Sequence, residues 1–438
     1  MTGANSATEQ DGPIWTGLLD LDQAGHVIGT GGPVRADHVL ARVLVRLHGA
    51  PVGYVSIAPR PEETLGARAR EAAEATLSPM LLSHAHCAEA SEPEPNSADR
   101  APITACPRSF PASDDVGVTI AIATRNRTEL LRSCLNAVQK LDHEKLEILV
   151  VDNAPSDSST QELVSELARS DPRLVYACEP GRGASAARNL ALASARYDIV
   201  ALTDDDVLVD PGWVSALVAG FAADPEVTCV TGFVAPNALD NPFQRYFEYR
   251  YPHQGLFVPA LFDMGQYRRS SSLYPFQAGI FGRGANMAVR RSAALKVGGF
   301  DPLLGAGALC RGGEDLDLFV RLILDGGRIC YMPSALIWHR HREDADALNN
   351  AVYVYGYGLG SYLSKHLSNR DLRTGLLAHA ARLPGPQVAR MKSASRSSQL
   401  GAHSFRLAMS EAYGVVAGVL GYRVAARRQA HAFSSGEK

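Results

Sequence analysis

The chain has 438 residues, of which 46% are hydrophobic and 20% charged, and its formal net charge is −3 at pH 7. This length predicts two or three domains with an ordinary apolar core, and the near-neutral charge gives no electrostatic reason to expect nucleic-acid binding. The seven cysteines form no CxxC pair, which favours free thiols in a reducing compartment over a zinc site or a disulfide framework. The N-terminus has no secretory signal pattern, and no apolar run reaches the ~18 residues of a spanning helix, so we expect a cytoplasmic protein.

We expect residues 1–87 to form a small accessory α+β module. One strand is predicted within 14–22 and another at 51–58, and the Ala- and Glu-rich segment 62–84 has good helix propensity. A further helix is predicted at 36–47, because its apolar residues recur at helical spacing. No cluster of chemical groups in this module indicates a site.

The segment 88–115 is rich in Ser, Pro, Glu and Asp, so it is predicted to be a linker. A second domain is expected at 116–345, where short apolar runs alternate with helical segments. This alternation predicts an α/β fold with parallel strands and right-handed crossovers. The strands expected in its first half lie at 116–123, 146–151, 174–177 and 199–202.

Three consecutive carboxylates follow the fourth of these strands, at Asp204, Asp205 and Asp206. They come at the carboxyl end of a buried parallel strand, which is where open α/β sheets bind ligands. Adjacent anions repel one another unless a cation lies between them, and a hard divalent ion such as Mg²⁺ or Mn²⁺, shared with a substrate phosphate, fits oxygen ligands. The alternative for an isolated acidic triplet is a solvated loop tip.

Other polar residues end the first two strands of this domain. Thr124, Asn126 and Arg127 follow the first strand, where a nucleotide should lie. Asp152 ends the second strand and can accept a hydrogen bond from a base N–H or a ribose hydroxyl.

Two arginines flank the start of the third crossover helix. Arg182 and Arg188 could both face a diphosphate, although for Arg188 simple packing of the helix is an equally good interpretation. Further along, Gly312-Gly313-Glu314-Asp315 opens another helix, and a carboxylate in the first turn has a fixed direction. Taken alone, this motif is a helix cap.

Two histidines, His339 and His341, follow the last predicted strand at 328–332. Neutral imidazole is a good ligand for a divalent metal. The alternative for either histidine is a structural or solvent-facing role, and the sequence does not decide between the two.

The order of these motifs resembles the family 2 glycosyltransferases of GT-A fold. The resemblance covers about residues 116–342, and each motif is weak alone, whereas six in the family's order and spacing make a strong signal. It implies a GT-A (nucleotide-diphospho-sugar transferase) Rossmann-like mixed sheet, between the small N-terminal module and a helical region at 346–438. The six motifs are Ala123–Arg127, Val151–Asn153, Gly183–Asn189, Thr203–Asp206, Gly312–Asp315 and the histidine beyond the last strand.

The resemblance implies a metal-dependent, inverting transfer of a sugar from a nucleotide-diphosphate-sugar, with a UDP-sugar as the first expectation. The acceptor would be a hydroxyl of a glycan, a lipid-linked molecule or a small molecule. Asp204 and Asp206 match the family's DxD element and would hold Mn²⁺ or Mg²⁺ and the ribose-diphosphate. His339, at about the family's distance beyond the base, is preferred over His341 as the third metal ligand.

In the same comparison Asp315 matches the family's catalytic base. A positioned carboxylate that takes the proton of the acceptor hydroxyl contributes about 10²–10⁴-fold to the rate. Glu314 and Asn286 are assigned to the acceptor side. The nucleotide-sugar side is expected to include Thr124, Asn126, Arg127, Asp152, Arg182, Arg188, Asp204 and Asp205.

Two other functions remain as alternatives. A nucleotidyltransferase on a similar sheet usually opens with a Gly-rich phosphate loop, but here Ala-Thr-Arg-Asn-Arg follows the first strand. A catalytically dead binder of glycans or sugar-nucleotides would have lost the base or the metal acids, and both are present. A dehydrogenase is disfavoured because no GxGxxG follows a strand.

The C-terminal region at 346–438 is predicted to be helical. An apolar stretch at 413–420 is followed by Arg423, Arg427 and Arg428. This pattern predicts either a peripheral contact with a membrane surface, which would place the protein at the inner face of the membrane, or a helical lid packed on the enzyme.

Overall fold

The structure is a computed structural model that describes most of the chain. The predicted linker at 88–115 lies outside the described residues except for Asp115. The five described cysteines are free, as expected. The described residues are 12–23, 27–59, 64–86, 115–141, 143–251, 257–381 and 401–435.

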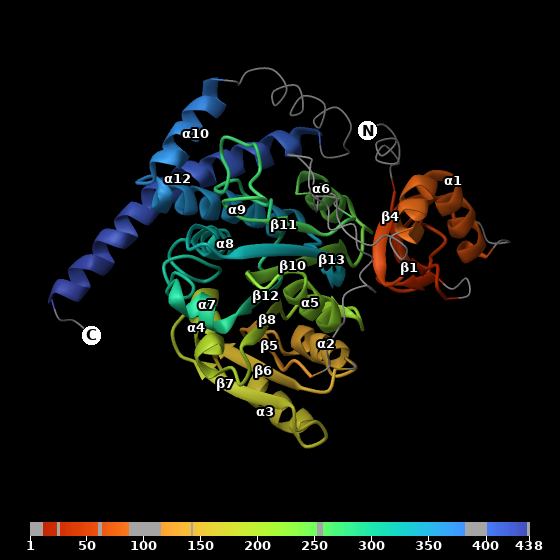
Figure 1. Ribbon diagram of the computed structural model, residues 1–438, viewed down its shortest axis with the longest axis horizontal. Coiled ribbons are helices and arrows are strands. Elements are labelled where there is room, and N and C mark those ends of the chain that lie inside the picture. The colour runs from red at the N-terminus through yellow and green to blue at the C-terminus, as the bar shows by residue number, and fades with distance from the viewer. Residues whose placement is uncertain are drawn as a thin grey trace.

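The N-terminal module is a four-stranded sheet covered on one face by a helix (Figure 1). Its strand order is β2-β1-β3-β4, and β3 lies between a parallel and an antiparallel neighbour. The elements are β1 (Ile14–Asp20), β2 (Val27–Gly29), β3 (Leu40–Leu47), β4 (Ala50–Ile57) and α1 (Leu65–His86).

The helix expected at 36–47 is wrong, because residues 40–47 form strand β3. Ala41 and Val43 pack beneath α1, whereas Leu44 packs against the second domain. A strand buried on both faces has no apolar–polar alternation, so its nearly continuous apolar run also satisfied a helical spacing.

The second domain is built on a nine-stranded mixed sheet. The strands β5, β6, β7 and β8 are parallel, whereas β12 runs antiparallel between β8 and β10. The order is β11-β13-β10-β12-β8-β5-β6-β7, with β9 paired to β13. This is the GT-A-like mixed sheet that the resemblance implies. The strands are β5 (Val118–Thr124), β6 (Leu146–Asn153), β7 (Leu174–Glu179), β8 (Ile199–Asp204), β9 (Val207–Val209), β10 (Val227–Pro236), β11 (Ala260–Phe262), β12 (Asn286–Arg290) and β13 (Arg328–His339).

Helices cover both faces of this sheet, and each face has its own hydrophobic core (Figure 1). Helices α2, α3 and α5 pack on one face, with Leu135 and Trp213 fully buried. Helices α4 and α8 pack on the other, with Phe319 fully buried. These helices and two shorter ones are α2 (Thr128–Val138), α3 (Ser159–Ala168), α4 (Ala184–Ser194), α5 (Trp213–Ala222), α6 (Pro242–Arg250), α7 (Arg291–Lys296) and α8 (Glu314–Leu324).

Strand register gathers the predicted site residues at one edge of the sheet. Thr124 of β5 pairs with Asp152 of β6, and Ala123 pairs with Asp204 of β8. On the other side of the sheet, β9 places Val207 opposite His339 at the end of β13. Side chains far apart in sequence therefore converge at the carboxyl ends of the parallel strands.

The C-terminal region is helical, as expected, and comprises α9 (Ala345–His366), α10 (Arg370–Ala381) and α12 (Gly401–Ser435). Helices α9 and α12 cross at close range because glycines line the crossing. A Cβ on Gly356 would lie 2.2 Å from the carbonyl oxygen of Glu411, and one on Gly418 would lie 2.0 Å from that of Tyr357. Within the described ranges, none of the helices has the length and apolar character needed to cross a membrane.

The N-terminal module is tied to the second domain by polar contacts. Arg46 of β3 donates to Asp20 at 2.7 Å and to Asp210 of the second domain at 2.8 Å, and all three side chains are at most 13% exposed. Arg35 makes an additional, more exposed ion pair with Asp240. The module is therefore docked on the sheet domain, with Arg46 as its best-buried ionic contact.

We predict that Arg46→Ala destabilises the protein by about 3–5 kcal/mol, because it leaves Asp20 and Asp210 as uncompensated, largely buried carboxylates. Urea denaturation measures this as a loss in the free energy of unfolding. Arg35→Ala, at an exposed pair on the same interface, is the control and should have a much smaller effect. Equal effects from the two variants would contradict this account of the interface.

Candidate active site

Asp204, Asp206 and His339 form a cluster in which one oxygen or nitrogen atom from each side chain lies within 4.8 Å of the others. The Nε2 atom of His339 is 3.4 Å from Oδ1 of Asp206. Burial lowers the pKa of His339 and so favours the neutral imidazole that can ligate a metal. Two carboxylates and one imidazole are a donor set suited to Mn²⁺ and, less strongly, to Mg²⁺, so these residues fit the expected ion.

The second histidine, His341, faces a different partner. Its Nε2 atom lies 3.3 Å from Oε2 of Glu248, and its ring packs 4.9 Å from that of Phe247, both on α6. The side chain is nearly fully buried in this position. The geometry therefore supports His339, rather than His341, as the third ligand.

Arginine partly neutralises the acidic triplet. Arg127 donates to Asp205 at 2.6 Å and to Asp206 at 3.0 Å, and the Thr124 hydroxyl donates to Asp205 at 2.7 Å. Asp205 is buried, and this burial raises its pKa to about 6. Both of its oxygens already bond within the protein, so the structure gives no support to the expected contact of Asp205 with the nucleotide. These bonds hold Arg127 and the end of β5 in place.

The side chain of Arg188 is engaged in ion pairs within the protein, so it differs from both expectations, packing of the helix alone and an unpaired arginine facing a diphosphate. Its guanidinium, with a side chain only 6% exposed, donates to Asp204 at 3.1 Å and to Glu314 at 2.8 Å. Burial raises the pKa of Glu314, while Arg188 opposes that shift. The buried guanidinium of Arg188 therefore joins the end of β8 to the first turn of α8. Glu314 is engaged in an ion pair inside the protein, which does not support its assignment to the acceptor side.

Asp315 is oriented by two backbone amides. Gly284 N–H donates to Oδ2 at 2.9 Å, and Leu316 N–H donates to Oδ1 at 2.8 Å. The approach of Gly284 is close, because a Cβ there would lie 2.9 Å from Cβ of Asp315. Asp315 is half-buried, so its carboxylate is fixed in direction but still partly accessible to solvent, next to the ion pairs of Arg188.

Asp152 is fully buried, and the Tyr176 hydroxyl donates to its Oδ2 at 3.1 Å. Its Oδ1 is buried and has no hydrogen-bond partner among the described residues, and burial raises its pKa. A buried acceptor without a partner is costly unless a ligand satisfies it. This observation supports the expected hydrogen bond from a base or ribose.

The loops around Asp152 are shaped by two asparagines. Asn126 has a left-handed backbone (φ 53°) and accepts a hydrogen bond from Ser156 N–H at 3.0 Å. Asn153, which sequence reasoning did not assign to the site, accepts from Gly183 N–H at 2.9 Å and donates to Gly181. These bonds hold the turn Gly181-Arg182-Gly183, in which the side chain of Arg182 is exposed to solvent.

The assignment of Asn286 to the acceptor side is not supported by the structure. Its side chain is fully buried, donates to the carbonyls of Phe233 and Ala335, and accepts from the indole N–H of Trp213 at 2.8 Å. All of its hydrogen-bonding capacity is thus used where β12 meets β10, and it is a structural residue of the sheet.

Two tyrosines near the site were not assigned to it from the sequence, whereas Arg342 was already a candidate for binding phosphate or an anionic acceptor. Tyr355 of α9 stacks on Tyr251 with ring centroids 5.0 Å apart and remains 46% exposed. Arg342 lies 3.8 Å from Asp206 and is also partly exposed. The tyrosine-rich pattern of α9 was visible in the sequence, but nothing in its spacing indicated which ring would face the site.

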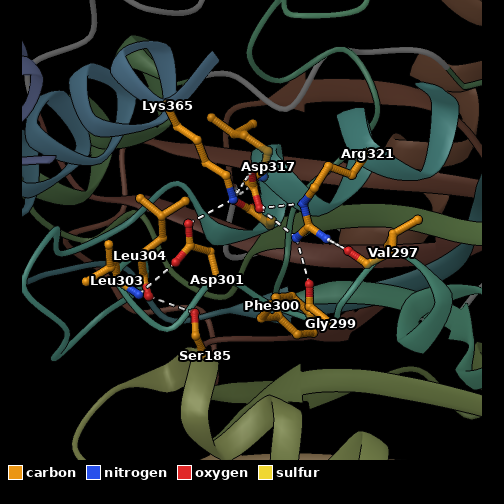
Figure 2. A network of polar contacts seen from close by, with 12 residues as sticks. Ser185, Val297, Gly299, Phe300, Asp301, Leu303, Leu304, Asp317, Arg321 and Lys365 are labelled. Carbon is orange, nitrogen blue, oxygen red and sulfur yellow. Dashed lines mark hydrogen bonds and ion pairs between the residues drawn. The ribbon is translucent and has the colours of Figure 1, made fainter. Parts of the chain in front are cut away.

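A buried ionic network ties α8, which carries Asp315, to α9 (Figure 2). Asp317 is fully buried and accepts from Arg321 at 2.6 Å, Lys365 at 2.8 Å and His366 at 3.0 Å. Lys365 also reaches Asp301 at 2.8 Å. Although burial opposes ionisation, these partners hold the pKa of Asp317 well below its usual range.

Comparisons with known proteins bear on the domain that contains this site, and the family match covers its Asp204 and Asp206 but ends before Asp315 and His339. Residues 119–297 match the family model described as Glycosyl transferase family 2. The chain is 32% identical over 242 residues to a pre-mycofactocin glycosyltransferase of Mycobacterium tuberculosis (strain H37Rv), which covers 54% of this chain and 45% of the relative. It is 26% identical over 224 residues to a poly-β-1,6-N-acetyl-D-glucosamine synthase of Staphylococcus aureus (strain COL), covering 51% and 49%.

The chain thus spans about half the length of these curated relatives. Among solved structures, it is similar to a mannosyltransferase, PcManGT from Pyrobaculum calidifontis, in complex with GDP-Man and Mn²⁺. That similarity has a TM-score of 0.47 at 20% identity and covers 80% of this chain and 96% of the other.

The Asp317 network predicts a specific dependence of stability on pH. Because the folded-state pKa of Asp317 is lowered, its stabilisation is fully present above the unfolded-state pKa of about 3.9 and is lost as the pH falls towards the folded-state value. We expect Asp317→Asn to lower the free energy of unfolding by about 3–5 kcal/mol at pH 7. Chemical denaturation at several pH values should show this difference shrinking below about pH 4; a difference that stays constant down to pH 3 would contradict the assignment.

Proposed function

Because the chain carries a glycosyl transferase family 2 domain at residues 119–297, we propose that this protein is a glycosyltransferase that moves a sugar from a nucleotide-diphosphate-sugar to an acceptor hydroxyl, with inversion. One observation carries the proposal. The buried Arg188 joins Asp204 of the metal-type cluster of Asp204, Asp206 and His339 to Glu314, the residue directly before the oriented carboxylate of Asp315.

On the donor side, Asp204, Asp206 and His339 would hold the divalent ion. When bound, the ion would neutralise the negative charge that develops on the departing nucleoside diphosphate. Arg342, which lies partly exposed beside Asp206, would add a positive charge for the diphosphate. The partnerless Oδ1 of Asp152 would accept a hydrogen bond from the base, and uracil offers such an N–H, so a UDP-sugar is the first donor to test.

On the acceptor side, Asp315 would take the proton of the attacking hydroxyl. The oxygen of that hydroxyl forms a bond to the anomeric carbon as the bond from that carbon to the diphosphate oxygen breaks, and attack from the opposite face inverts the configuration. The amides of Gly284 and Leu316 fix the direction of the carboxylate, and a positioned base contributes about 10²–10⁴-fold.

The accessible stack of Tyr251 and Tyr355 is the best candidate for an acceptor platform, because aromatic faces can pack against sugar rings or apolar groups. The names of the two relatives refer to different molecules, pre-mycofactocin and poly-β-1,6-N-acetyl-D-glucosamine. We therefore propose a hydroxyl acceptor, in a glycan, a lipid-linked molecule or a small molecule, without choosing among them.

The two alternative functions are less well supported. A nucleotidyltransferase does not account for the family match at 119–297. A catalytically dead binder does not require a carboxylate held by two amides at Asp315, together with an intact cluster at Asp204, Asp206 and His339.

We predict that Asp315→Asn lowers kcat by about 10²–10⁴-fold, because the amide cannot accept the acceptor's proton. Binding of the nucleoside diphosphate, measured by calorimetry with Mn²⁺, should be unchanged. Asp325→Asn makes the same chemical change at the exposed C-terminal end of α8 and should retain normal turnover. Near-normal turnover of Asp315→Asn would show that another group is the base.

We predict that Asp206→Ala weakens metal-dependent nucleotide binding by at least about 10-fold, because it removes a ligand from the three-residue cluster. Calorimetric titrations with UDP, with Mn²⁺ and with EDTA, measure the effect directly. Glu343→Ala removes a nearby but exposed carboxylate outside the cluster and should leave binding intact. If Asp206→Ala binds UDP with the same dependence on Mn²⁺ as the unaltered protein, the metal assignment is wrong.

A further inference from the structure

Helix α12 presents a continuous row of large hydrophobic side chains to solvent. Six of them, on a single helix, are between 51% and 68% exposed. They follow one another at intervals of three or four residues, which is the spacing of one helical face. The six residues are Phe405, Met409, Tyr413, Val416, Leu420 and Val424.

This row, the α12 stripe, lies largely opposite the face that packs on the protein, and its Tyr413 also stacks on a ring of α9, that of Tyr353. At 100° per residue its members fall within an arc of about 100°. The opposite face contains Leu407, Gly418 and Ala425, which are buried. The fold therefore uses one side of α12 for packing against α9 and leaves the apolar other side uncovered over a length of about 28 Å.

Positive charge accompanies the α12 stripe. Arg406 lies near its beginning, Arg423 and Arg427 fall within the same arc near its end, and all three are exposed. The only acidic residue in the sequence between 405 and 428 is Glu411, and it pairs with Arg250 and Tyr251 on the packed side. The exposed face of α12 is thus apolar and basic, with no acidic group of its own.

We propose that α12 binds an anionic lipid surface, with the stripe inserted at the interface and the arginines at the level of the headgroups. Apolar residues on one helical face together with basic residues are the requirements for a helix that lies on a membrane. A second copy of the chain is a poorer occupant, because pairing two such faces would bring arginines together with no exposed carboxylate to neutralise them.

The geometry of α12 is compatible with this role without rearrangement. The helix is anchored along α9, where Ser361 and Ser364 donate to the carbonyls of Gly418 and Val419. Its C-terminal end extends past the rest of the fold (Figure 1). The proposal does not depend on the glycosyltransferase assignment, since it rests on the surface of α12 alone.

Vesicle flotation with the full chain tests the proposal. Vesicles of phosphatidylcholine alone are compared with vesicles containing phosphatidylglycerol in addition. The protein should float with the anionic vesicles and remain in the dense fraction with the neutral ones. Raising the salt concentration should weaken binding, because it screens the arginines.

Two variants separate the contributions of the apolar and basic groups. Val416→Glu combined with Leu420→Glu should reduce the bound fraction at least about 10-fold, and Arg423→Gln combined with Arg427→Gln should reduce the affinity about fivefold per arginine. Ile28→Glu introduces one carboxylate at an exposed apolar residue of the N-terminal module and should bind normally. Thermal melting checks that all the variants are folded.

Three results would overturn the proposal. In the first, the unaltered chain does not bind anionic vesicles. In the second, the folded stripe variants bind as well as Ile28→Glu does. In the third, the chain is a dimer by light scattering and the Val416→Glu and Leu420→Glu variant is a monomer, which would show that a second copy covers the stripe.

Discussion

The candidate active site depends on one buried cation. Arg188 has almost no exposure to solvent and contacts Asp204 at the end of β8 and Glu314 at the start of α8. Without it, the carboxylates of Asp204 and Glu314 would lose the positive charge they share, and Glu314, whose side chain is only 12% exposed, would be left largely buried and unpaired, which is costly. With Arg188 in place, the end of β8, which would hold the donor, and the start of α8, which carries the proposed base, are joined through one side chain.

The surroundings of this cation are organised to keep it in place. The ionic network of Asp317 joins α8 to α9. The backbone amide of Gly284 donates a hydrogen bond to Asp315. On the metal side, His341 bonds to Glu248, which in turn accepts from Arg42 of the N-terminal module at 3.4 Å. The accessory module and the C-terminal helices are therefore linked to the site through side chains, although neither supplies a residue of the metal cluster.

The sequence was sufficient for the features that depend on local pattern. Alternating apolar runs and helical segments predicted the α/β fold and its parallel strands, whereas the mixed character of the sheet was implied only by the family resemblance. The acids after β8 were correctly placed at the carboxyl edge of the sheet. The strand at β3 was missed because burial on both faces removes the alternation that distinguishes strand from helix. Asn286 was assigned to the acceptor side, whereas all the hydrogen bonds of its side-chain amide are made inside the sheet.

Other features depend on contacts between segments far apart in sequence, which no local pattern encodes. His341 differs from His339 in its contact with Glu248, which lies more than ninety residues away in the sequence. The position of Arg188 depends on its ion pair with Glu314, which is separated from it by more residues than His341 is from Glu248. In both cases the residue type was informative, but its partner was not visible before the chain was folded.

The central claim is that one site holds both a metal-bound nucleotide and the base that activates the acceptor. The most direct test is an anomalous diffraction map from crystals grown with Mn²⁺ and UDP. The account predicts one manganese peak among Asp204, Asp206 and His339, with the diphosphate on it and the carboxylate of Asp315 turned toward the sugar end of the nucleotide site. A peak at His341, or a nucleotide bound with Asp315 closed off behind other side chains, would contradict it.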